Sequence, residues 1–409
     1  MNILFVINKL ELGGAETFLL RLVKSLKEEF GIMPFLYCVE PSKGNLNFEK
    51  YFLDETRIIK ISTYRNPTGI FNWVGWKINA IFYKVFKVSP YENYLVKRKK
   101  NYFKSILLKD RINLINSHLL GADSFVLENI FPLAEIPWVA TSQGCYNDLA
   151  DIHFAKELMS AINGLTFVAE KNLDFFNLND INIVENSRLI YNGIPKPTKD
   201  STIARNELGF AEDDIVLIHV SRSIPSKGME ESILATMLAG KSLNTSKLKL
   251  LIVGPENEYY SELKSKYRDL DFVKFYGEHL KPIELVQCAD IGILPSFFHG
   301  ESCPSTIIEY LAFGKPIVST VLGEIPNMIK FNDETAGILV ELDAETKTPK
   351  VESLSESIFL LVSNTDLYLR KSEIALKAFE KFEIAKSSNL YLEVYKNAIL
   401  NYERKNQEK

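Results

Sequence analysis

Short apolar runs alternate with stretches of helical periodicity along most of the chain. Residues 3–7 form an apolar run, a Gly-Gly turn follows, and residues 14–26 then place apolar side chains at helical spacing. Strands that alternate with helices predict parallel sheets with helices on both faces, so we expect an α/β protein. The predicted strands are residues 3–7, 111–117, 136–141, 164–168, 187–191, 214–220, 248–254, 272–276, 290–294 and 316–320.

A break in this pattern divides the chain. Residues 192–197 (NGIPKP) contain two prolines and a glycine, which end a strand and indicate a linker. The length of 409 residues also exceeds that of one ordinary domain. We predict one domain over residues 1–197, a second over 198–385, and a C-terminal helix over 386–409. The helices predicted in the second half cover residues 228–240, 257–268, 282–288 and 304–313, and another helix is expected to begin near Ile203.

The composition is that of an ordinary soluble protein, with 46% apolar and 24% charged residues. Cys38, Cys145, Cys288 and Cys303 form no CxxC pair, which is typical of free thiols in a reducing compartment. The first residues have no basic segment before their apolar run, so they indicate a strand rather than a signal peptide. No apolar stretch reaches the roughly 18 residues of a membrane-spanning helix. We therefore expect a cytoplasmic protein.

The net charge of −4 conceals a strong asymmetry. Residues 57–111 carry thirteen Lys/Arg against two acidic residues, a net charge of +11, so the rest of the chain carries −15. Such a distribution predicts one surface that meets an anionic partner.

Residues 70–104 mix aromatic, aliphatic and basic side chains. Six apolar residues share one helical face: Phe71, Val74, Ile78, Ile81, Phe82 and Val85. Lys77 and Lys84 share another face, and a basic run, KRKK, follows at 97–100. Two interpretations remain open: an interfacial anchor that meets anionic lipid, or a helix packed on the core with a solvated basic face. No RNA-binding motif accompanies these residues, so we do not expect nucleic acid as a partner.

A first candidate site lies in residues 297–309 (FFHGESCPSTIIE), directly after a predicted strand. Pro304 suits the first position of a helix, with Ser302 or Cys303 as the cap. The N–H groups and the dipole of a helix start favour phosphate.

Two glutamates flank that predicted phosphate site. Glu301 stands just before the helix start, and Glu309 stands one turn after Ser305 on the same face. A carboxylate can accept two hydrogen bonds from the cis-diol of a ribose. The order of carboxylate, phosphate and carboxylate matches a sugar, a diphosphate and a ribose, although two isolated helix glutamates can also arise by chance.

Two further motifs follow strands. Arg222 and Lys227, in the segment VSRSIPSKG after the strand at 214–220, can clamp a diphosphate or form a solvated basic loop. Gly13-Gly14 opens the first helix and is not a GxGxxG fingerprint. It either lets the backbone approach a phosphate or simply forms a tight turn.

In this order, the three motifs resemble those of the family 4 glycosyltransferases, which have the GT-B fold. The run HGESCPSTIIEYLAFGKPIVST (299–320) is similar to the family's E-x7-E signature and the strand after it. NGI at 192–194 resembles the family's domain junction, and LGEIP at 322–326 resembles its next loop. The resemblance implies two facing Rossmann-like domains, an N-terminal one for the acceptor and a C-terminal one for a nucleotide-sugar. It also implies a last helix that crosses back to the N-terminal domain.

The resemblance also assigns roles to individual residues. Glu301 is expected to bind hydroxyls of the donor sugar, Glu309 the ribose, and Arg222 with Lys227 the diphosphate. Backbone amides near the helix start are expected to donate hydrogen bonds to the donor, from Ser302, Cys303 and Ser305. Gly14 is expected to let the N-terminal backbone approach the phosphate, and His118 to lie near the reacting sugar.

The implied activity is that of a retaining glycosyltransferase (EC 2.4) that uses a UDP-sugar without a metal or another cofactor. The expected acceptor is a glycan or a polyprenyl-diphosphate-linked glycan in the biosynthesis of a bacterial surface polysaccharide, lipopolysaccharide or capsule, at the inner face of the plasma membrane. Gln143-Gly144 and Ala169-Glu170 depart from the family pattern in the acceptor half. Two alternatives are a sugar-nucleotide 2-epimerase of the same fold and an inactive, membrane-associated partner of other enzymes.

Overall fold

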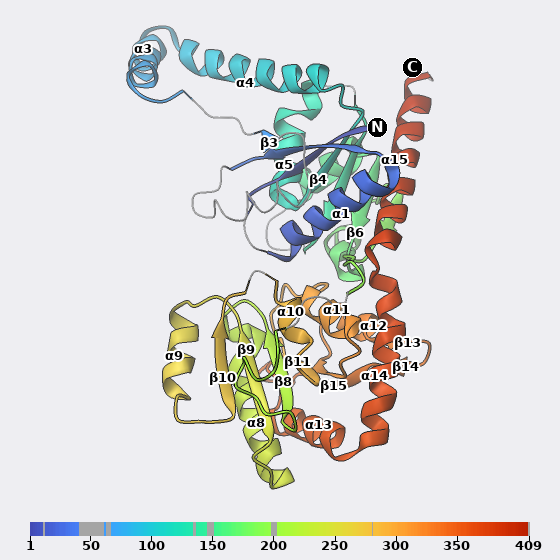
Figure 1. The fold of residues 1–409 in the computed structure, drawn as a ribbon. Coiled ribbons are helices and arrows are strands. Elements are labelled where there is room, and N and C mark those ends of the chain that lie inside the picture. Colours follow the sequence, from blue (N-terminus) through green and yellow to red (C-terminus); the bar gives the residue numbers. More distant parts are fainter. Residues whose placement is uncertain are drawn as a thin grey trace. The chain divides into compact units, whose positions relative to one another are not determined.

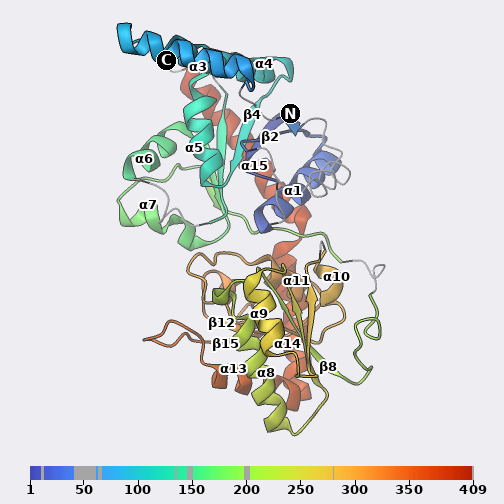
Figure 2. The same cartoon turned by 90° about the vertical axis from the view of Figure 1, so that its left-hand side faces the viewer.

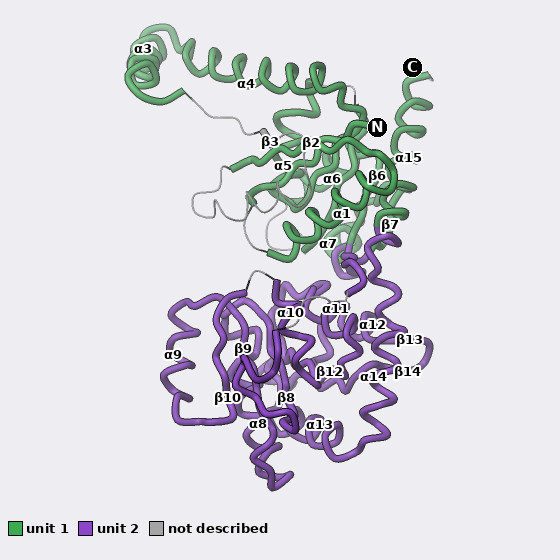
Figure 3. Tube along the Cα trace, viewed as in Figure 1, with its two compact units in different colours: residues 1–167, 173–190, 388–409 green, residues 168–172, 191–387 purple. Residues whose placement is uncertain are grey.

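The chain forms two compact units in a computed structural model that describes residues 1–10, 13–40, 61–62, 67–133, 136–144, 151–197, 203–279 and 281–407 (Figures 1 and 3). Unit 1 comprises residues 1–167, 173–190 and 388–409, and unit 2 comprises residues 168–172 and 191–387. Cys145 and the basic residues Arg57, Lys60 and Arg65 lie outside the described residues.

Unit 1 is built on a seven-stranded sheet in the order β3-β2-β1-β4-β5-β6-β7, and every strand pair is parallel. The chain passes from β1 to β2 and β3 and then returns to β4, so the strand order reverses between β1 and β4. The strands are β1 (Asn2–Ile7), β2 (Met33–Cys38), β3 (Ile61–Ser62), β4 (Leu114–His118), β5 (Trp138–Ser142), β6 (Gly164–Phe167) and β7 (Ser187–Leu189).

Helices cover both faces of this sheet, as expected for buried parallel strands. Helices α5, α6 and α7 lie on one face, and α1 and α15 lie on the other (Figure 2). The helices of unit 1 are α1 (Gly14–Phe30), α3 (Ile70–Phe86), α4 (Pro90–Lys109), α5 (Leu120–Asn129), α6 (Ile152–Ala161), α7 (Asp174–Leu178) and, from Ser388 onward, α15 (Ile384–Gln407).

The last helix is held to unit 1 by buried polar contacts. The Ser388 hydroxyl donates to Ser25 Oγ at 2.8 Å, and the Tyr395 hydroxyl donates to Asn116 Oδ1 at 2.7 Å. The prediction of a C-terminal helix that returns to the N-terminal part of the chain is therefore confirmed.

Unit 2 contains a six-stranded parallel sheet in the order β10-β9-β8-β11-β12-β15 and a small antiparallel hairpin. Here the strand order reverses between β8 and β11. The strands are β8 (Ile215–Val220), β9 (Leu248–Val253), β10 (Val273–Gly277), β11 (Ile291–Leu294), β12 (Ile317–Thr320), β13 (Lys330–Phe331), β14 (Glu334–Thr335) and β15 (Gly337–Val340). The helices are α8 (Met229–Leu243), α9 (Glu258–Lys266), α10 (Ile283–Val286), α11 (Ser305–Ala312), α12 (Ile325–Met328), α13 (Val351–Ser363) and α14 (Thr365–Phe379).

These two parallel sheets confirm the predicted α/β class. Each predicted strand has a counterpart, whereas β2, β3 and β15 were not predicted, because short apolar runs are ambiguous without a sheet around them. The helix expected near Ile203 is wrong. Residues 205–209 form hydrogen-bonded turns instead. Gly209 has a left-handed φ of +74°, which a right-handed helix cannot contain.

Two short segments of the predicted N-terminal domain belong to unit 2, which contiguous domains over 1–197 and 198–385 do not anticipate. Residues 168–172 belong to unit 2, where the Asn172 amide donates to Ser302 Oγ at 3.1 Å and Lys171 Nζ donates to the His299 carbonyl at 3.1 Å. Residues 191–197 also belong to unit 2, where Ile194 forms an isolated parallel bridge with Glu383.

Within the described ranges, the helices are all too short or too polar to cross a membrane.

Candidate active site

The loop after β8 turns sharply and buries a lysine. Residues Pro225–Lys227 form a single 3-10 turn, and Gly228 follows with a left-handed φ of +77°. A Cβ atom on Gly228 would lie 2.4 Å from the Pro295 carbonyl oxygen, so a glycine is needed where this loop crosses the end of β11. The turn places Lys227, with only 7% of its surface exposed, beside the loop that follows β11.

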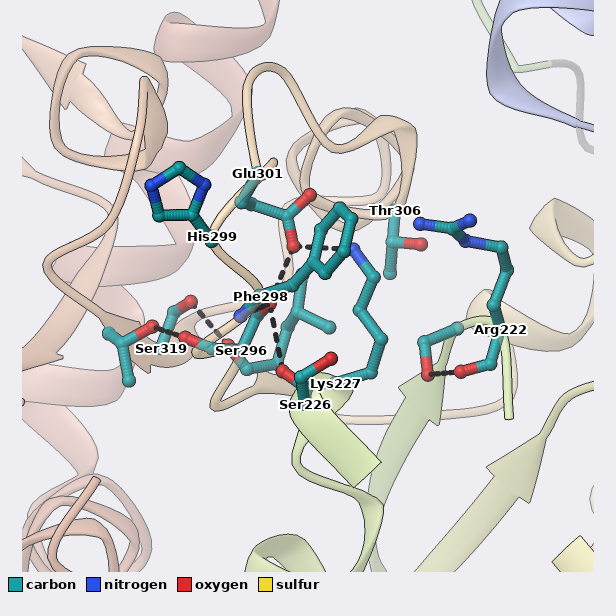
Figure 4. Close-up of polar contacts among 12 residues, drawn as sticks. Arg222, Ser226, Lys227, Ser296, Phe298, His299, Glu301, Thr306 and Ser319 are labelled. Carbon is teal, nitrogen blue, oxygen red and sulfur yellow. Dashed lines mark hydrogen bonds and ion pairs between the residues drawn. The ribbon is translucent and has the colours of Figure 1, made fainter. Parts of the chain in front are cut away.

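Lys227 forms a buried ion pair with Glu301. Lys227 Nζ lies 2.5 Å from Glu301 Oε2, and the Ser296 hydroxyl donates to the same carboxylate oxygen at 2.6 Å (Figure 4). The second oxygen of Glu301 is turned away from Lys227 (Figure 4). One carboxylate oxygen thus orients the lysine, and the other can accept hydrogen bonds from a hydroxylated ligand.

The electrostatics of this pair favour an anion. Burial lowers the pKa of Lys227, the Glu301 carboxylate acts in the opposite direction, and Arg222 and Lys171 lower it further. The exposed Arg222 and the half-buried Lys171 thus add positive charge near the buried pair of Lys227 and Glu301. An anionic ligand such as a phosphate would relieve the mutual repulsion of these cations.

A phenylalanine lies close to both cations of the β8 loop. The Phe298 ring centroid is 5.1 Å from Arg222 Cζ and 5.0 Å from Lys227 Nζ. Such distances allow cation–π attraction, which restrains two long side chains that otherwise move freely. We refer to Arg222, Lys227, Ser296, Phe298 and Glu301 as the β8–β11 cluster.

Helix α11 begins next to this cluster because it is tied to the end of β8. Thr306 Oγ1 donates to the Val220 carbonyl at 3.0 Å, and the Tyr310 hydroxyl donates to the Ile218 carbonyl at 2.9 Å. The helix starts at Ser305 with Pro304 as its N-cap, one residue later than predicted, because Pro304 adopts an extended ψ of 118°. Glu309 lies one turn further along and is 6% exposed.

The segment between Glu301 and α11 is held by contacts within unit 2, with Ser302 buried and Cys303 and Pro304 half-buried. The Ser302 hydroxyl accepts a hydrogen bond from the Asn172 amide, and Cys303 lies against the core of unit 2. Burial raises the pKa of Cys303 to about 12, so its thiol stays protonated at neutral pH and is a poor nucleophile. The structure thus places Ser302, Cys303 and Ser305 in one continuous backbone segment beside the β8–β11 cluster.

The two remaining candidates lie in unit 1, at the reversal point of its own sheet. Gly14 is the first residue of α1, after β1, and His118 ends β4 opposite Ile7. His118 is fully buried, and burial lowers its pKa to about 3, so the ring is neutral at physiological pH. Its Nε2 lies 2.9 Å from Asn116 Oδ1, and its Nδ1 lies 3.4 Å from Gln143 Nε2.

Sequence reasoning gave no individual role to three residues that shape the site in unit 2: Ser296, Phe298 and Glu324. Glu324 is 3% exposed and accepts hydrogen bonds from the Tyr191 hydroxyl at 2.7 Å and the Asn327 amide at 3.0 Å. Ser296 and Phe298 directly follow a predicted strand, which is a signal that could have identified them.

The fold and the site define an α/β domain with cations at a strand-order reversal, where such sheets bind their ligands. Residues 200–379, which include the β8–β11 cluster, match the family described as glycosyl transferases group 1.

Curated relatives resemble part of the chain. It is 26% identical over 200 residues to the N-acetyl-alpha-D-glucosaminyl L-malate synthase of Bacillus anthracis, covering 48% of this chain and 49% of that protein. It is 28% identical over 188 residues to the N,N'-diacetylbacillosaminyl-diphospho-undecaprenol alpha-1,3-N-acetylgalactosaminyltransferase of Campylobacter jejuni, covering 46% of each. The chain thus spans about half the length of these curated relatives.

Among solved structures, Alr3699/HepE of Anabaena, crystallised in complex with UDP, resembles nearly the whole chain. The TM-score is 0.72 at 18% identity, covering 96% of this chain and 99% of that one. This likeness shows the fold, and it confirms the prediction of the GT-B class.

Proposed function

We propose that this protein is a retaining glycosyltransferase that moves a sugar from a UDP-sugar to a glycan or a polyprenyl-diphosphate-linked acceptor in surface polysaccharide biosynthesis. The observation that carries the proposal is the buried pair of Lys227 and Glu301 beside the start of α11. A family match over residues 200–379 and the UDP complex of Alr3699/HepE support the choice of donor.

The donor would lie along the β8–β11 cluster. Lys227 and Arg222 would meet the diphosphate, the N–H groups of the first turn of α11 would add hydrogen bonds, and Glu309 would accept those of the ribose. Glu301 would bind sugar hydroxyls through the oxygen that Lys227 and Ser296 do not occupy. Of unit 1, Gly14 is proposed to let the backbone approach the phosphate closely. His118 is proposed to supply a neutral polar group near the reacting sugar.

The reaction breaks the bond between the anomeric carbon and the diphosphate and forms a bond from that carbon to the acceptor oxygen on the same face. The acceptor hydroxyl loses its proton to the departing diphosphate. Charge that develops on the diphosphate is met by Lys227 and Arg222, and preorganised electrostatics of this kind is often the largest catalytic contribution. We propose that this stabilisation requires no metal and no other cofactor.

The acceptor and the location are part of the same proposal. The Campylobacter jejuni relative is named for a diphospho-undecaprenol substrate, and residues 70–104 of this chain combine exposed aromatic and basic side chains. We place the protein in the cytoplasm, in peripheral contact with the anionic inner face of the plasma membrane through residues 70–104.

The proposal is tested by incubating the purified chain with a panel of UDP-sugars and a polyprenyl-diphosphate-linked glycan. We expect UDP release that depends on the acceptor, and a product whose anomeric configuration by NMR equals that of the donor. Acceptor-independent conversion of the donor to its C2 epimer would indicate the epimerase instead. The absence of any donor turnover across the panel would indicate an inactive partner.

A second arm tests the metal-free chemistry. We expect EDTA to leave the initial rate unchanged. A rate that EDTA abolishes and Mg²⁺ restores would overturn this part of the proposal while leaving the transferase assignment intact.

A further inference from the structure

Helix α3 exposes far more apolar surface than a soluble protein normally leaves uncovered. Of its 17 residues, only Gly75 and Asn79 are buried. Phe71 is 82% exposed and Phe86 is 65% exposed. The other exposed large apolar side chains of α3 are Ile70, Trp73, Val74, Trp76, Ile78, Ile81, Phe82, Tyr83 and Val85.

The polarity of α3 is inverted relative to a helix packed on a core. Its inward side is small and polar: Tyr91 of α4 fills the space beside Gly75, and the Tyr91 hydroxyl donates to Asn72 Oδ1 at 3.0 Å. The Asn79 side chain accepts from the N–H groups of Tyr91 and Glu92 at 3.1 and 3.4 Å and so caps the start of α4. The apolar side chains therefore point outward, and α3 lies at the N-terminal end of α4, away from the sheet (Figure 1).

Helix α4 carries exposed cations beside the residues that it packs on the core. Phe103, Ile106 and Leu107 are buried against the core of unit 1. Lys97, Lys100 and Lys104 follow one another at helical spacing on the exposed side. The described segment 67–111 contains ten Lys/Arg and two acidic residues.

An apolar groove continues this surface at the C-terminal end of α4. Its lining is mostly apolar, with three polar residues among the eight: Leu107, Leu108, Ile112, Leu133 and Ile136, together with Lys104, Arg111 and Asn113. Leu108 is 78% exposed.

We propose that α3 inserts into the interface of an anionic lipid bilayer as an inverted amphipathic helix, while Lys97, Lys100 and Lys104 of α4 contact the lipid headgroups. The inference rests on the proposed function, which supplies the membrane near the acceptor. It adds which side chains of α3 and α4 contact that membrane. A bilayer fits better than a second copy of this chain, because two copies would bring surfaces of like charge together. Aromatic residues beside lysines are typical of helices that lie in the interface.

Intrinsic fluorescence can report this insertion directly. The chain has three tryptophans: Trp73 and Trp76 are 61% and 46% exposed on α3, whereas Trp138 is fully buried in the core. We expect a blue shift of the emission when the protein meets vesicles of phosphatidylcholine and phosphatidylglycerol in equal parts at low salt. Brominated phosphatidylcholine in the same vesicles should quench it, while Trp138 supplies a constant background.

Two sets of variants separate the apolar from the ionic contribution. Phe71→Asp/Val85→Asp should lower vesicle affinity at least about tenfold, and Leu178→Asp, at a site 79% exposed on α7, should not. Lys97→Gln/Lys100→Gln/Lys104→Gln should lower affinity for the anionic vesicles on the order of 100-fold and leave affinity for pure phosphatidylcholine unchanged. The matched triple variant Lys247→Gln/Lys264→Gln/Lys266→Gln on unit 2 should change neither beyond a small general charge effect.

Two outcomes would overturn the inference: an emission spectrum that vesicles do not change, or lipid-free dimerisation that Phe71→Asp/Val85→Asp abolishes. Transfer to a soluble acceptor analogue, measured in parallel, should be unaffected by these variants. Failure of vesicle binding with intact transfer would therefore reject only the insertion, and the converse would reject only the proposed activity.

Discussion

Lys227 and Glu301 form an ion pair with an Nζ to Oε2 distance of 2.5 Å, and their side chains are only 9% and 6% exposed. Sequence reasoning assigned Lys227 to the diphosphate and Glu301 to the sugar. In the structure, the two side chains already neutralise each other's charge without a ligand. Removing either partner leaves an uncompensated charge in a place that water hardly reaches. The sequence alone predicts that Lys227→Ala keeps the fold and loses turnover by at least about 100-fold, and burial adds a cost in stability.

The pair can be dissected by a double-mutant cycle. We expect Lys227→Met and Glu301→Gln each to lower the free energy of unfolding by roughly 3 kcal/mol or more, and the double variant to recover much of that loss. Turnover should fall at least about 100-fold in all three variants. Urea denaturation and UDP release measure the two effects. Strictly additive stability losses would show that the pair is not coupled.

Phe298 is predicted to restrain the two cations of the β8 loop. Phe298→Leu removes the aromatic face that lies near Arg222 and Lys227, so we expect kcat/KM to fall by about tenfold, in line with one to two cation–π contacts. Phe298→Tyr keeps the ring and should retain most of the activity. Equal losses in both variants would assign Phe298 a packing role instead.

The position of Glu301 depends on Gly323. Gly323 has a φ of +55°, and a Cβ atom there would lie 2.4 Å from the Glu301 carbonyl oxygen. We expect Gly323→Ala to displace the Glu301 backbone and lower kcat by at least about tenfold, because small misplacements of catalytic groups are costly. Gly240→Ala in α8, where an added Cβ meets nothing closer than 3.7 Å, serves as the control. Normal kcat in Gly323→Ala would show that the loop tolerates the shift.

Glu309 is predicted to bind the ribose of the donor. Replacing its carboxylate in Glu309→Gln should weaken UDP binding about 10-fold or more, since hydrogen bonds to charged groups contribute roughly 1.5–3 kcal/mol. Isothermal titration calorimetry with UDP measures this loss, and Glu352→Gln in the exposed first turn of α13 is the control. An unchanged Kd for UDP in Glu309→Gln would remove Glu309 from the donor site.

The fold was accessible from the sequence because parallel strands buried on both faces leave continuous apolar runs. The same periodicity located the loops in which Arg222, Lys227 and Glu301 lie. What it could not give is the pairing of Lys227 with Glu301, because that contact joins two loops 74 residues apart and depends on the tight crossing at Gly228.

The short segments that join unit 2 and the outward face of α3 were also beyond sequence reasoning. Residues 168–172 join unit 2 through side-chain hydrogen bonds of Lys171 and Asn172, which leave no periodic signal. For α3, the pattern left a membrane anchor and a core-packed helix open. The structure separates these two interpretations at Asn79. Its side chain caps the start of α4, so the polar side of α3 faces α4 and the apolar side faces outward.

A buried histidine in β8 should make stability depend on pH. Burial lowers the pKa of His219 to about 3, with a further lowering by Lys227, while the unfolded chain keeps a value near 6.5. Between these values the unfolded state binds more protons, so stability falls as the pH falls, by about 1.4 kcal/mol per pH unit for this group. His219 Nδ1 and Nε2 lie 2.9 and 2.8 Å from the hydroxyls of Ser232 and Ser221, contacts that hold the neutral ring in place.

His219→Gln should therefore be less stable than the parent at about pH 7.5, and the difference should shrink by about 2 kcal/mol on going to about pH 5. Urea denaturation followed by circular dichroism at both pH values measures the change. His153→Gln, at a side chain 84% exposed on α6, is the control for the loss of a histidine at the surface. Because carboxylates contribute equally to both proteins, a stability difference between His219→Gln and the parent that stays constant with pH would mean that His219 binds a proton as readily in the folded state as in the unfolded chain.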